Sequence, residues 1–324
     1  MSGHILTALL LLFTACGDDT RPQDSGGLAG DPAGPMSSTG ADPTPTSATS
    51  TTTSTGGEPT PTTTADSTST SSATTDAPRL DLGAAPDFAA PATGCTKVDL
   101  LFVIDNSLSM AAEQDSLIAS FPGFITGIQA QLVDADSYHV GIVSTDDYAD
   151  NPASCRTLGA LVTSTGKAQC GPYAAGGSWM SEADDLAASF ACAGRVGITG
   201  ASDERPVAAA IAAIGDPLAA PGACNEGFFR DDALLVITII TDEEDDAEMK
   251  NGGSPGDPAS WFTAIVARKA GLETNAVVLA VVGGASNNQC PPYSPPQGAE
   301  DAPRLRSFAE SFTYGSVGDV CADS

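Results

Sequence analysis

The sequence predicts an α/β protein with a doubly wound, mostly parallel sheet, which follows a disordered N-terminal tether. Residues 100–104 and 233–240 are runs of apolar, partly β-branched residues, the pattern of strands buried on both faces. Helix-like segments alternate with strands between residues 94 and 324, as in folds that wind helices over a parallel sheet. Large apolar residues are almost absent from residues 17–93.

Periodicity places each element of the folded part in turn. Strands are expected at 100–104, 138–144, 158–163, 233–240, 276–282 and 316–320. Helices are expected at 110–132, 182–191, 205–214, 259–270 and 303–312. The helix at 205–214 opens near Pro206, a residue suited to the first helical turn.

Residues 1–15 are typical of a secretory signal peptide. Their apolar run is too short to span a bilayer and has the length of a signal-peptide core. Small residues precede Cys16, which resembles the bacterial lipobox, where this cysteine is acylated and becomes the mature N-terminus. We therefore expect a lipid on Cys16; the alternative is an ordinary secretory signal with a chance cysteine.

Residues 16–93 are predicted to be a disordered linker, because Thr, Ser, Pro, Gly and Ala dominate the segment. A flexible coil of this length spans roughly 50 Å on average, enough to hold a domain clear of a membrane. The remaining residues, 94–324, have the size of a single α/β domain.

The chain is strongly acidic, with a formal charge of −28. Residues 1–94 contribute −8 from ten acidic residues and two arginines, so residues 95–324 carry −20. This charge argues against nucleic acid and anionic membrane surfaces as partners. We expect contact with a membrane only through the N-terminal lipid.

Seven cysteines follow Cys16, and none of them forms a C-x-x-C pair, so a structural zinc site is not expected. Behind a signal sequence, disulfides are the natural interpretation. Proximity in sequence suggests the pairs Cys155–Cys170, Cys192–Cys224 and Cys290–Cys321, with Cys95 left over. Alternatively, Cys95 pairs with Cys321 and closes the domain.

Conventional catalytic motifs are missing from the sequence. His139 is the only histidine beyond the signal, and its apolar surroundings predict a buried sheet residue instead of a triad member or a zinc ligand. The sequence has no Gly-rich phosphate loop with a lysine and no G-x-S-x-G motif. We therefore expect a protein that is not an enzyme.

Oxygen-bearing side chains follow both buried apolar runs. Asp105 ends the first run and begins the pattern D-x-S-x-S with Ser107 and Ser109, while Asp242 follows the second run. If the two strands are neighbours, these side chains meet at the switch point of the sheet and form a site for a hard cation. Thr199, in the loop before the Pro206 helix, offers another hydroxyl. The alternatives are that Asp105 and its serines cap the next helix and that 242–246 is a solvated acidic loop.

These motifs resemble those of von Willebrand factor type A (vWA) domains, and more narrowly those of secreted vWA-like lipoproteins of myxobacteria. The resemblance covers about residues 95–321. It rests on V-D-L-L-F-V-I-D-N-S-L-S-M, Y-H-V-G-I-V-S-T-D-D and G-F-F-R-D-D-A-L-L-V-I-T-I-I-T-D-E-E-D-D. It implies a Rossmann-like fold and a metal-ion-dependent adhesion site (MIDAS) that holds Mg²⁺, with Mn²⁺ or Ca²⁺ as alternatives.

Carried over to this chain, the resemblance implies that Ser107 and Ser109 ligate the metal directly. Asp105 and Asp242 would hold it mostly through water, and the family's threonine would align with Thr199 or with Ile198, which has no side-chain oxygen. An ion held in this way keeps an open position that an acidic side chain of a protein partner would complete.

The resulting expectation is a metal-dependent, adhesion-type protein-binding module on the bacterial cell envelope, lipid-anchored at the outer membrane or cell surface. One alternative is a phosphoryl-transfer hydrolase of the haloacid-dehalogenase type, which also places an Asp after its first strand. That class needs a second Asp two residues later, where this chain has Ser107. Another alternative is a structural envelope protein whose metal site has decayed.

Overall fold

A computed structural model describes residues 96–131, 137–201, 204–245, 252–285, 288–294 and 297–322. The expected signal peptide, the linker, Cys16 and Cys95 lie outside these residues. In the described part, no helix has the length and apolar character needed to cross a bilayer.

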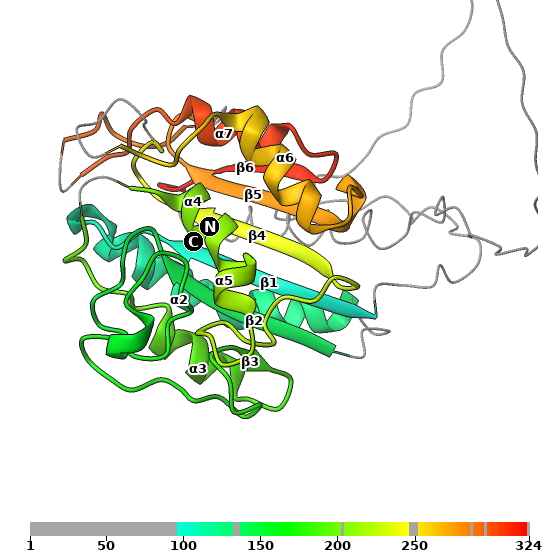
Figure 1. Ribbon diagram of the computed structural model, residues 1–324. Helices are drawn as coiled ribbons and strands as arrows, with labels where there is room; N and C mark the ends of the chain where they lie inside the picture. The colour runs from blue at the N-terminus through cyan, green and yellow to red at the C-terminus, as the bar shows by residue number, and fades with distance from the viewer. Residues whose placement is uncertain are drawn as a thin grey trace, which may run out of the picture. The chain divides into compact units, whose positions relative to one another are not determined.

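A six-stranded sheet in the order β3-β2-β1-β4-β5-β6 forms the centre of the described structure (Figure 1). The strands are β1 (Lys97–Ile104), β2 (Ser137–Ser144), β3 (Met180–Ser181), β4 (Leu234–Ile240), β5 (Ala276–Val282) and β6 (Gly315–Asp319). All neighbouring strands are parallel except β2 and β3. The predicted fold class, a mostly parallel α/β sheet, is confirmed.

Helices cover both faces of this sheet. The α-helices are α2 (Ala111–Gln131), α3 (Leu186–Ala193), α4 (Pro206–Ala213), α5 (Asp216–Ala219), α6 (Pro258–Arg268) and α7 (Pro303–Glu310). Short 3₁₀ turns are η1 (Leu108–Met110), η2 (Ala153–Cys155) and η3 (Glu273–Asn275). Each predicted helix is present, with ends shifted by a few residues; α5, β3 and the 3₁₀ turns were not predicted.

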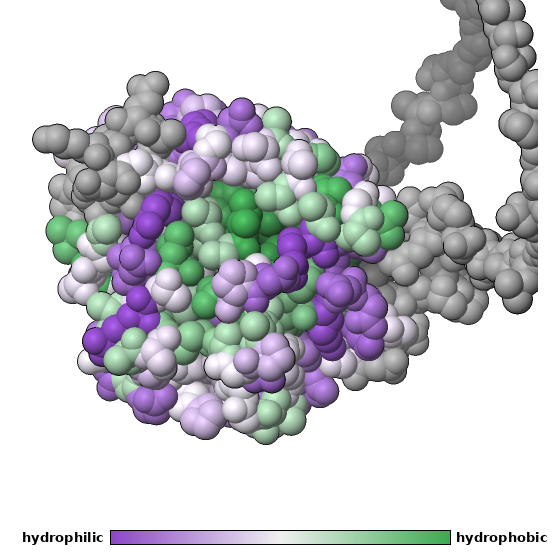
Figure 2. Space-filling view, viewed as in Figure 1, coloured by the Kyte–Doolittle hydropathy of each residue, from purple (hydrophilic) through white to green (hydrophobic). Residues whose placement is uncertain are grey.

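Alternate residues of the strands point to opposite faces and build two cores. On the α2–α3 side, Phe102 packs edge-on against Phe190, which stacks on Phe121 with 3.5 Å between ring centroids. On the side of α4, α6 and α7, Trp261 packs edge-on against Phe308. Seen from the latter side, apolar residues gather near the centre of the face and polar residues surround them (Figure 2).

The strands β1 and β4 lie side by side at the topological switch point. Ile104 pairs with Ile240 at their carboxyl ends. The chain continues from β1 to β2 on one side, and from β4 to β5 and β6 on the other. In open α/β sheets, ligands bind outside the carboxyl ends of strands at such a point. The sequence-based condition for a shared site, that the two strands are neighbours, is met.

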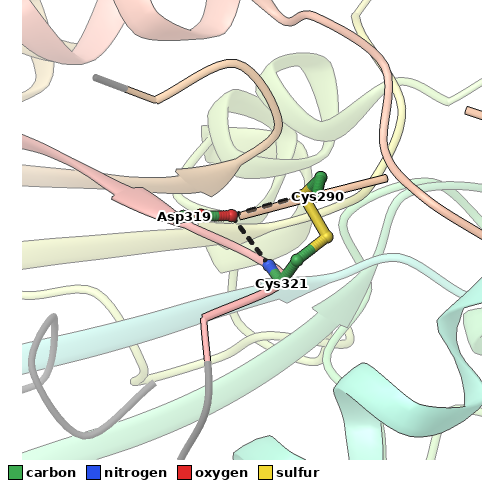
Figure 3. A group of neighbouring side chains, drawn as sticks. All are labelled: Cys290, Asp319 and Cys321. Atoms are coloured by element: carbon green, nitrogen blue, oxygen red, sulfur yellow. Dashed lines mark hydrogen bonds between the residues drawn. A yellow bond between two sulfur atoms is a disulfide. The ribbon is translucent and has the colours of Figure 1, made fainter. Parts of the chain in front are cut away.

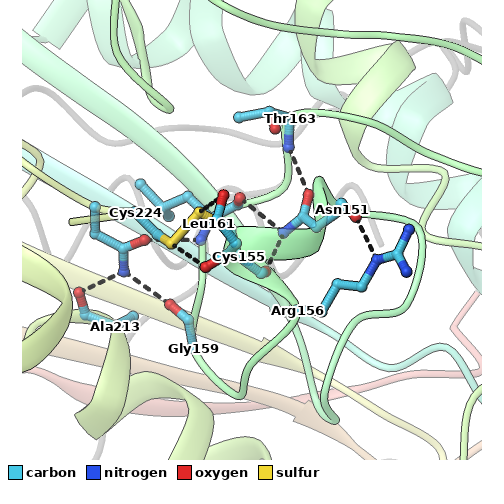
Figure 4. The surroundings of a disulfide bond; sticks show 10 residues. Asn151, Cys155, Arg156, Gly159, Leu161, Thr163, Ala213 and Cys224 are labelled. Atoms are coloured by element: carbon cyan, nitrogen blue, oxygen red, sulfur yellow. Dashed lines mark hydrogen bonds between the residues drawn. A yellow bond between two sulfur atoms is a disulfide. The ribbon is translucent and has the colours of Figure 1, made fainter. Parts of the chain in front are cut away.

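The predicted strand at 158–163 is wrong. The segment runs beside β2, where the Val162 N–H donates to the Ile142 carbonyl at 2.8 Å, but the Tyr173 hydroxyl bonds the Val162 carbonyl and side-chain amides bond the flanking N–H groups, so no continuous ladder forms. The Leu161 N–H donates to the Asn225 side chain at 2.9 Å, and the Thr163 N–H donates to the Asn151 side chain at 3.1 Å (Figure 4). The edge strand next to β2 is the two-residue β3 instead.

All six disulfide candidates are bonded, but two of the three expected pairs are wrong. The bonds are Cys155–Cys224, Cys170–Cys192 and Cys290–Cys321. The last was predicted, and it excludes the alternative pair of Cys321 with Cys95. The first arises because the 151–163 segment folds against the loop after α5, which brings together cysteines 69 residues apart (Figure 4). Proximity in sequence does not report this long-range packing.

Candidate metal centre

Asp105 lies one residue beyond β1, and both strands of the switch point fix its position. Its backbone N–H donates to the Ile240 carbonyl of β4 at 3.0 Å, and its side chain is fully buried. One carboxylate oxygen accepts from the Ser107 N–H at 2.6 Å, and the other accepts from the Thr241 hydroxyl at 2.6 Å. The carboxylate is thus held across the ends of β1 and β4, and Ser107 makes no side-chain cap at η1.

The two serine hydroxyls lie next to each other beneath the surface. The Oγ atoms of Ser107 and Ser109 are 3.2 Å apart, and both residues are buried. Gln114 fixes this loop against the segment before α4: its side chain donates to the Asp105 carbonyl at 2.9 Å and to the Gly197 carbonyl at 2.7 Å. The D-x-S-x-S turn therefore presents three buried oxygen groups in a fixed arrangement.

Asp242 lies one residue beyond Thr241 and is 1% exposed. Neither of its carboxylate oxygens accepts a hydrogen bond of ordinary geometry, although the Ser109 hydroxyl is close enough to lower the pKa. Burial raises the pKa of Asp242 to about 6, and the charges of Glu113 and Glu300 add to the rise. Burial likewise raises the pKa of Asp105 to about 7, with Asp242 contributing to the rise.

Glu204, which was not predicted from the sequence, is a third buried carboxylate at this end of the sheet. It is 2% exposed, and neither side-chain oxygen has a hydrogen-bond partner of ordinary geometry. Burial, followed by the charge of Asp105, raises its pKa to about 10, while the nearby Thr145 hydroxyl opposes the rise. Its only sequence signal is an acidic residue two positions before the proline that begins α4.

Thr199 belongs to a loop that packs against the site. The Gly200 N–H donates to the Asn106 carbonyl at 2.9 Å, and a Cβ on Gly200 would come within 2.3 Å of the Asn106 side chain, which would then have to move. Thr199 itself is exposed, whereas Asp105, Ser107, Ser109 and Asp242 are all buried. The structure brings these four together, and the role of Thr199 stays a prediction.

The acidic run after β4 has divided roles and is not simply a solvated loop. Glu244 accepts from the Arg304 N–H at 2.7 Å and so caps α7. Asp245 is fully buried, accepts from the Ser254 hydroxyl at 2.6 Å and accepts from the Val207 N–H of α4 at 3.1 Å. Asp246 lies outside the described residues. Only Asp242 among the buried acids of this run is left without an ordinary hydrogen bond.

Unpartnered buried polar atoms concentrate at the carboxyl end of the sheet. In the described part of the chain, eight buried side-chain oxygen or nitrogen atoms lack a partner, and all but Arg268 Nε belong to this end. They come from Asn106, Glu113, Thr145, Glu204 and Asp242. A buried carboxylate without a partner is costly, and a hard cation is the group that three carboxylates and two hydroxyls fit. These residues therefore fit a divalent ion.

A second group of possible ligands is not a metal site as it stands. Ligand atoms of Cys290, Asp319 and Cys321 lie within 4.8 Å of one another (Figure 3). Both sulfurs are joined in the disulfide, so neither offers the thiolate that binds metals. His139 is a buried residue of β2, as predicted, and its ring stacks on Trp179 with 3.5 Å between centroids.

Neither the protein-family models nor the curated proteins include a match to this chain.

Proposed function

We propose that the domain binds a divalent cation at the carboxyl ends of β1 and β4 and uses it to bind a protein partner at the bacterial envelope. The observation that carries the proposal is that two buried carboxylates beside Asp105 at the switch point of the sheet, Asp242 and Glu204, accept no hydrogen bond of ordinary geometry. The resemblance to vWA domains supports it, because the matching motifs occupy these same strand ends. The proposed ion is Mg²⁺, and Mn²⁺ and Ca²⁺ are the alternatives.

Within this proposal the chain's own residues have separate tasks. Ser107 and Ser109 supply neutral oxygen ligands, and Thr241 orients Asp105 through its 2.6 Å hydrogen bond. Asp242 contributes negative charge from the neighbouring strand. The bound ion would supply a positive centre with an exchangeable position for a partner's oxygen. The resemblance implies that this oxygen comes from an acidic side chain of the partner, with the neutral Thr199 as the fifth donor to the ion.

The haloacid-dehalogenase alternative has less support. Its second carboxylate is replaced by Ser107, and among the described residues no lysine or arginine forms an ion pair with Asp105 or Asp242. Two arginines near this end of the sheet are engaged elsewhere, Arg205 with Asp147 and Arg304 with the Asp245 and Gly256 carbonyls, so neither is paired with the two aspartates that would flank a transferred phosphate. The decayed-site alternative is opposed by the buried oxygens described above, since unpaired carboxylates are costly to keep.

The proposal is tested by melting the purified full-length chain with saturating MnCl₂ or MgCl₂ and with a chelator. A ligand that binds only the native state adds about 2.7 kcal/mol at a hundredfold excess over its Kd, so the cation should raise the melting temperature. Asp105→Ala and Asp242→Asn should lose this shift. Glu310→Gln, an exposed acid at the end of α7, is the matched control and should keep it. If the cation leaves the melting temperature of the wild type unchanged, the site is refuted.

Attachment to the envelope rests on Cys16, the 16–93 linker and the signal-like start of the chain. Expressed in a bacterium, the wild type should incorporate labelled fatty acid and partition into detergent, and Cys16→Ala should do neither. Equal labelling of both would overturn the lipid anchor without affecting the metal site.

A further inference from the structure

The position of Glu204 is fixed from both sides of the switch point. The next residue, Arg205, donates its N–H to the Thr145 carbonyl at the end of β2, at 3.1 Å. Val207 donates its N–H to Asp245, in the loop after β4, at 3.1 Å. These two bonds hold the start of α4 over the ends of β2 and β4. Glu204 is therefore buried beside Asp105, and neither carboxylate oxygen accepts a hydrogen bond of ordinary geometry, although the Thr145 hydroxyl lies nearby.

This third carboxylate changes the charge of the site. The ligands predicted from the sequence contain two carboxylates, Asp105 and Asp242, which just balance a divalent ion. With Glu204 ionised around the same ion, the loaded site has a formal charge of −1. In a buried environment, where charges interact strongly, that excess disfavours another anion.

Half-buried side chains next to the site are also negatively charged. Glu113, at the start of α2, and Glu300, whose N–H donates to the Asp242 carbonyl at 2.8 Å, are half-buried there, and both raise the pKa of Asp242. Glu243 is also half-buried and accepts a hydrogen bond from the Tyr293 hydroxyl. A partner's carboxylate that approached the ion would thus meet acidic neighbours as well.

We propose that Glu204 is a carboxylate ligand of the cation, and that the loaded site takes an uncharged oxygen of its partner, such as an amide or hydroxyl, in preference to a carboxylate. The inference rests on the proposed cation site and replaces the acidic partner group expected from the sequence. It assigns Glu204 the role expected of Thr199. Partner recognition then depends on a neutral side chain or a backbone carbonyl.

The first test measures Mn²⁺ affinity of the full-length chain from the electron paramagnetic resonance signal of free Mn²⁺. Glu204→Gln keeps the size of the side chain and removes its charge, and it should weaken Mn²⁺ binding about tenfold or more, which is about 1.4 kcal/mol. Glu310→Gln should bind Mn²⁺ as the wild type does. Equal affinity in Glu204→Gln and the wild type would overturn the ligand role of Glu204. Absence of Mn²⁺ binding by the wild type would instead refute the proposed function itself.

The second test uses acetate and acetamide, which have similar shapes but differ in charge, as probes of the exchangeable position. Bound Mn²⁺ broadens the methyl proton resonance of a probe that reaches it, and the broadening left in Asp105→Ala is subtracted as background. The Mn²⁺-loaded wild type should broaden acetamide at least as much as acetate, and Glu204→Gln should reverse this order. Stronger broadening of acetate by the wild type would overturn the inference, and this comparison does not depend on the variant folding.

Discussion

Each end of β1 has a fully buried aspartate, and the two carboxylates differ in the charge of their neighbours. Asp99, near the start of the strand, is bound by Arg230: the backbone N–H donates to one carboxylate oxygen at 2.7 Å and the guanidinium Nε to the other at 2.8 Å. Asp105, just past the other end, is bound by a hydroxyl and a backbone N–H and lies beside Asp242 and Glu204.

The difference shows at which end of the sheet the chain itself supplies a positive charge for the buried carboxylate. Burial raises the pKa of both aspartates, to about 6 for Asp99 and about 7 for Asp105. At Asp99, Arg230 opposes the rise, and Lys269 adds a weaker opposing charge. At Asp105, the neighbouring charges come from acids and increase the rise. The Asp99 end supplies its own cation, whereas the Asp105 end needs one from outside.

The largest effect is expected from removing the cation that the chain does supply. Arg230→Met would leave Asp99 buried without its partner and should lower the free energy of unfolding by about 3–5 kcal/mol. Asp105→Asn, measured in chelator, should not lower it, because it removes a charge from an acidic cluster. Denaturant unfolding of both variants checks the contrast. The double variant Asp99→Asn, Arg230→Met should recover part of the loss; equal losses for Arg230→Met and Asp105→Asn would break the comparison.

How much of this contrast the sequence could predict depends on the range of the interactions. Local runs of apolar residues located β1 and β4, and the first acidic residue after each run located Asp105 and Asp242. Glu204 was missed because its burial comes from the docking of α4 over distant strand ends, which leaves no local pattern. The Asp99–Arg230 pair joins residues 131 positions apart and was equally hidden.

The same range of interaction explains the errors. Sequence proximity could not pair Cys155 with Cys224, because their approach depends on how the 151–163 segment packs against the loop after α5. In that packing, side chains of Asn225 and Tyr173 bond the Leu161 N–H and the Val162 carbonyl, so the apolar run keeps one backbone bond to β2 but does not form a strand.

A second prediction concerns the pH dependence of the acidic end without its cation. A carboxyl group with a raised folded-state pKa stabilises the protein at low pH, and this contribution is lost as the pH rises through the folded value. In chelator, stability should therefore fall between about pH 4 and pH 8 as Asp105 and Asp242 ionise, on the order of 2–4 kcal/mol, and it should keep falling above pH 8 because burial raises the pKa of Glu204 to about 10. Melting temperatures across this range check the slope. Asp105→Asn should flatten it, and saturating Mn²⁺ should restore stability at pH 8; a slope that Asp105→Asn leaves unchanged would contradict the assignment.

At the Asp99 end, His139 should respond to pH with the opposite sign, whereas Asp99 itself, with its raised pKa, should respond as Asp105 does. His139 Nδ1 lies 3.7 Å from a carboxylate oxygen of Asp99. Burial nevertheless lowers the pKa of the His139 ring to about 4, and the charge of Arg230 makes a smaller contribution in the same direction. A histidine with a lowered folded-state pKa stabilises the protein above the pKa of the unfolded state, about 6.5. That contribution to the free energy of unfolding, on the order of 2 kcal/mol, is lost as the pH falls towards 4. An NMR titration of the ring checks this directly. A midpoint near 6.5 would show that Asp99 and Arg230 leave the ring free to charge.

The smallest effect is expected from the residue that the sequence placed in the site and the structure leaves exposed. If Glu204 takes the place of Thr199, Thr199→Ala should change Mn²⁺ affinity by less than about twofold, below about 0.4 kcal/mol. Ser107→Ala is the matched comparison, since it removes a hydroxyl of similar size that is buried 3.2 Å from Ser109, and it should weaken Mn²⁺ binding clearly. Titration of both variants under identical conditions decides the matter. A loss in Thr199→Ala as large as that in Ser107→Ala would mean that the 197–201 loop closes over the ion, and that the site predicted from the sequence forms only when the cation is bound.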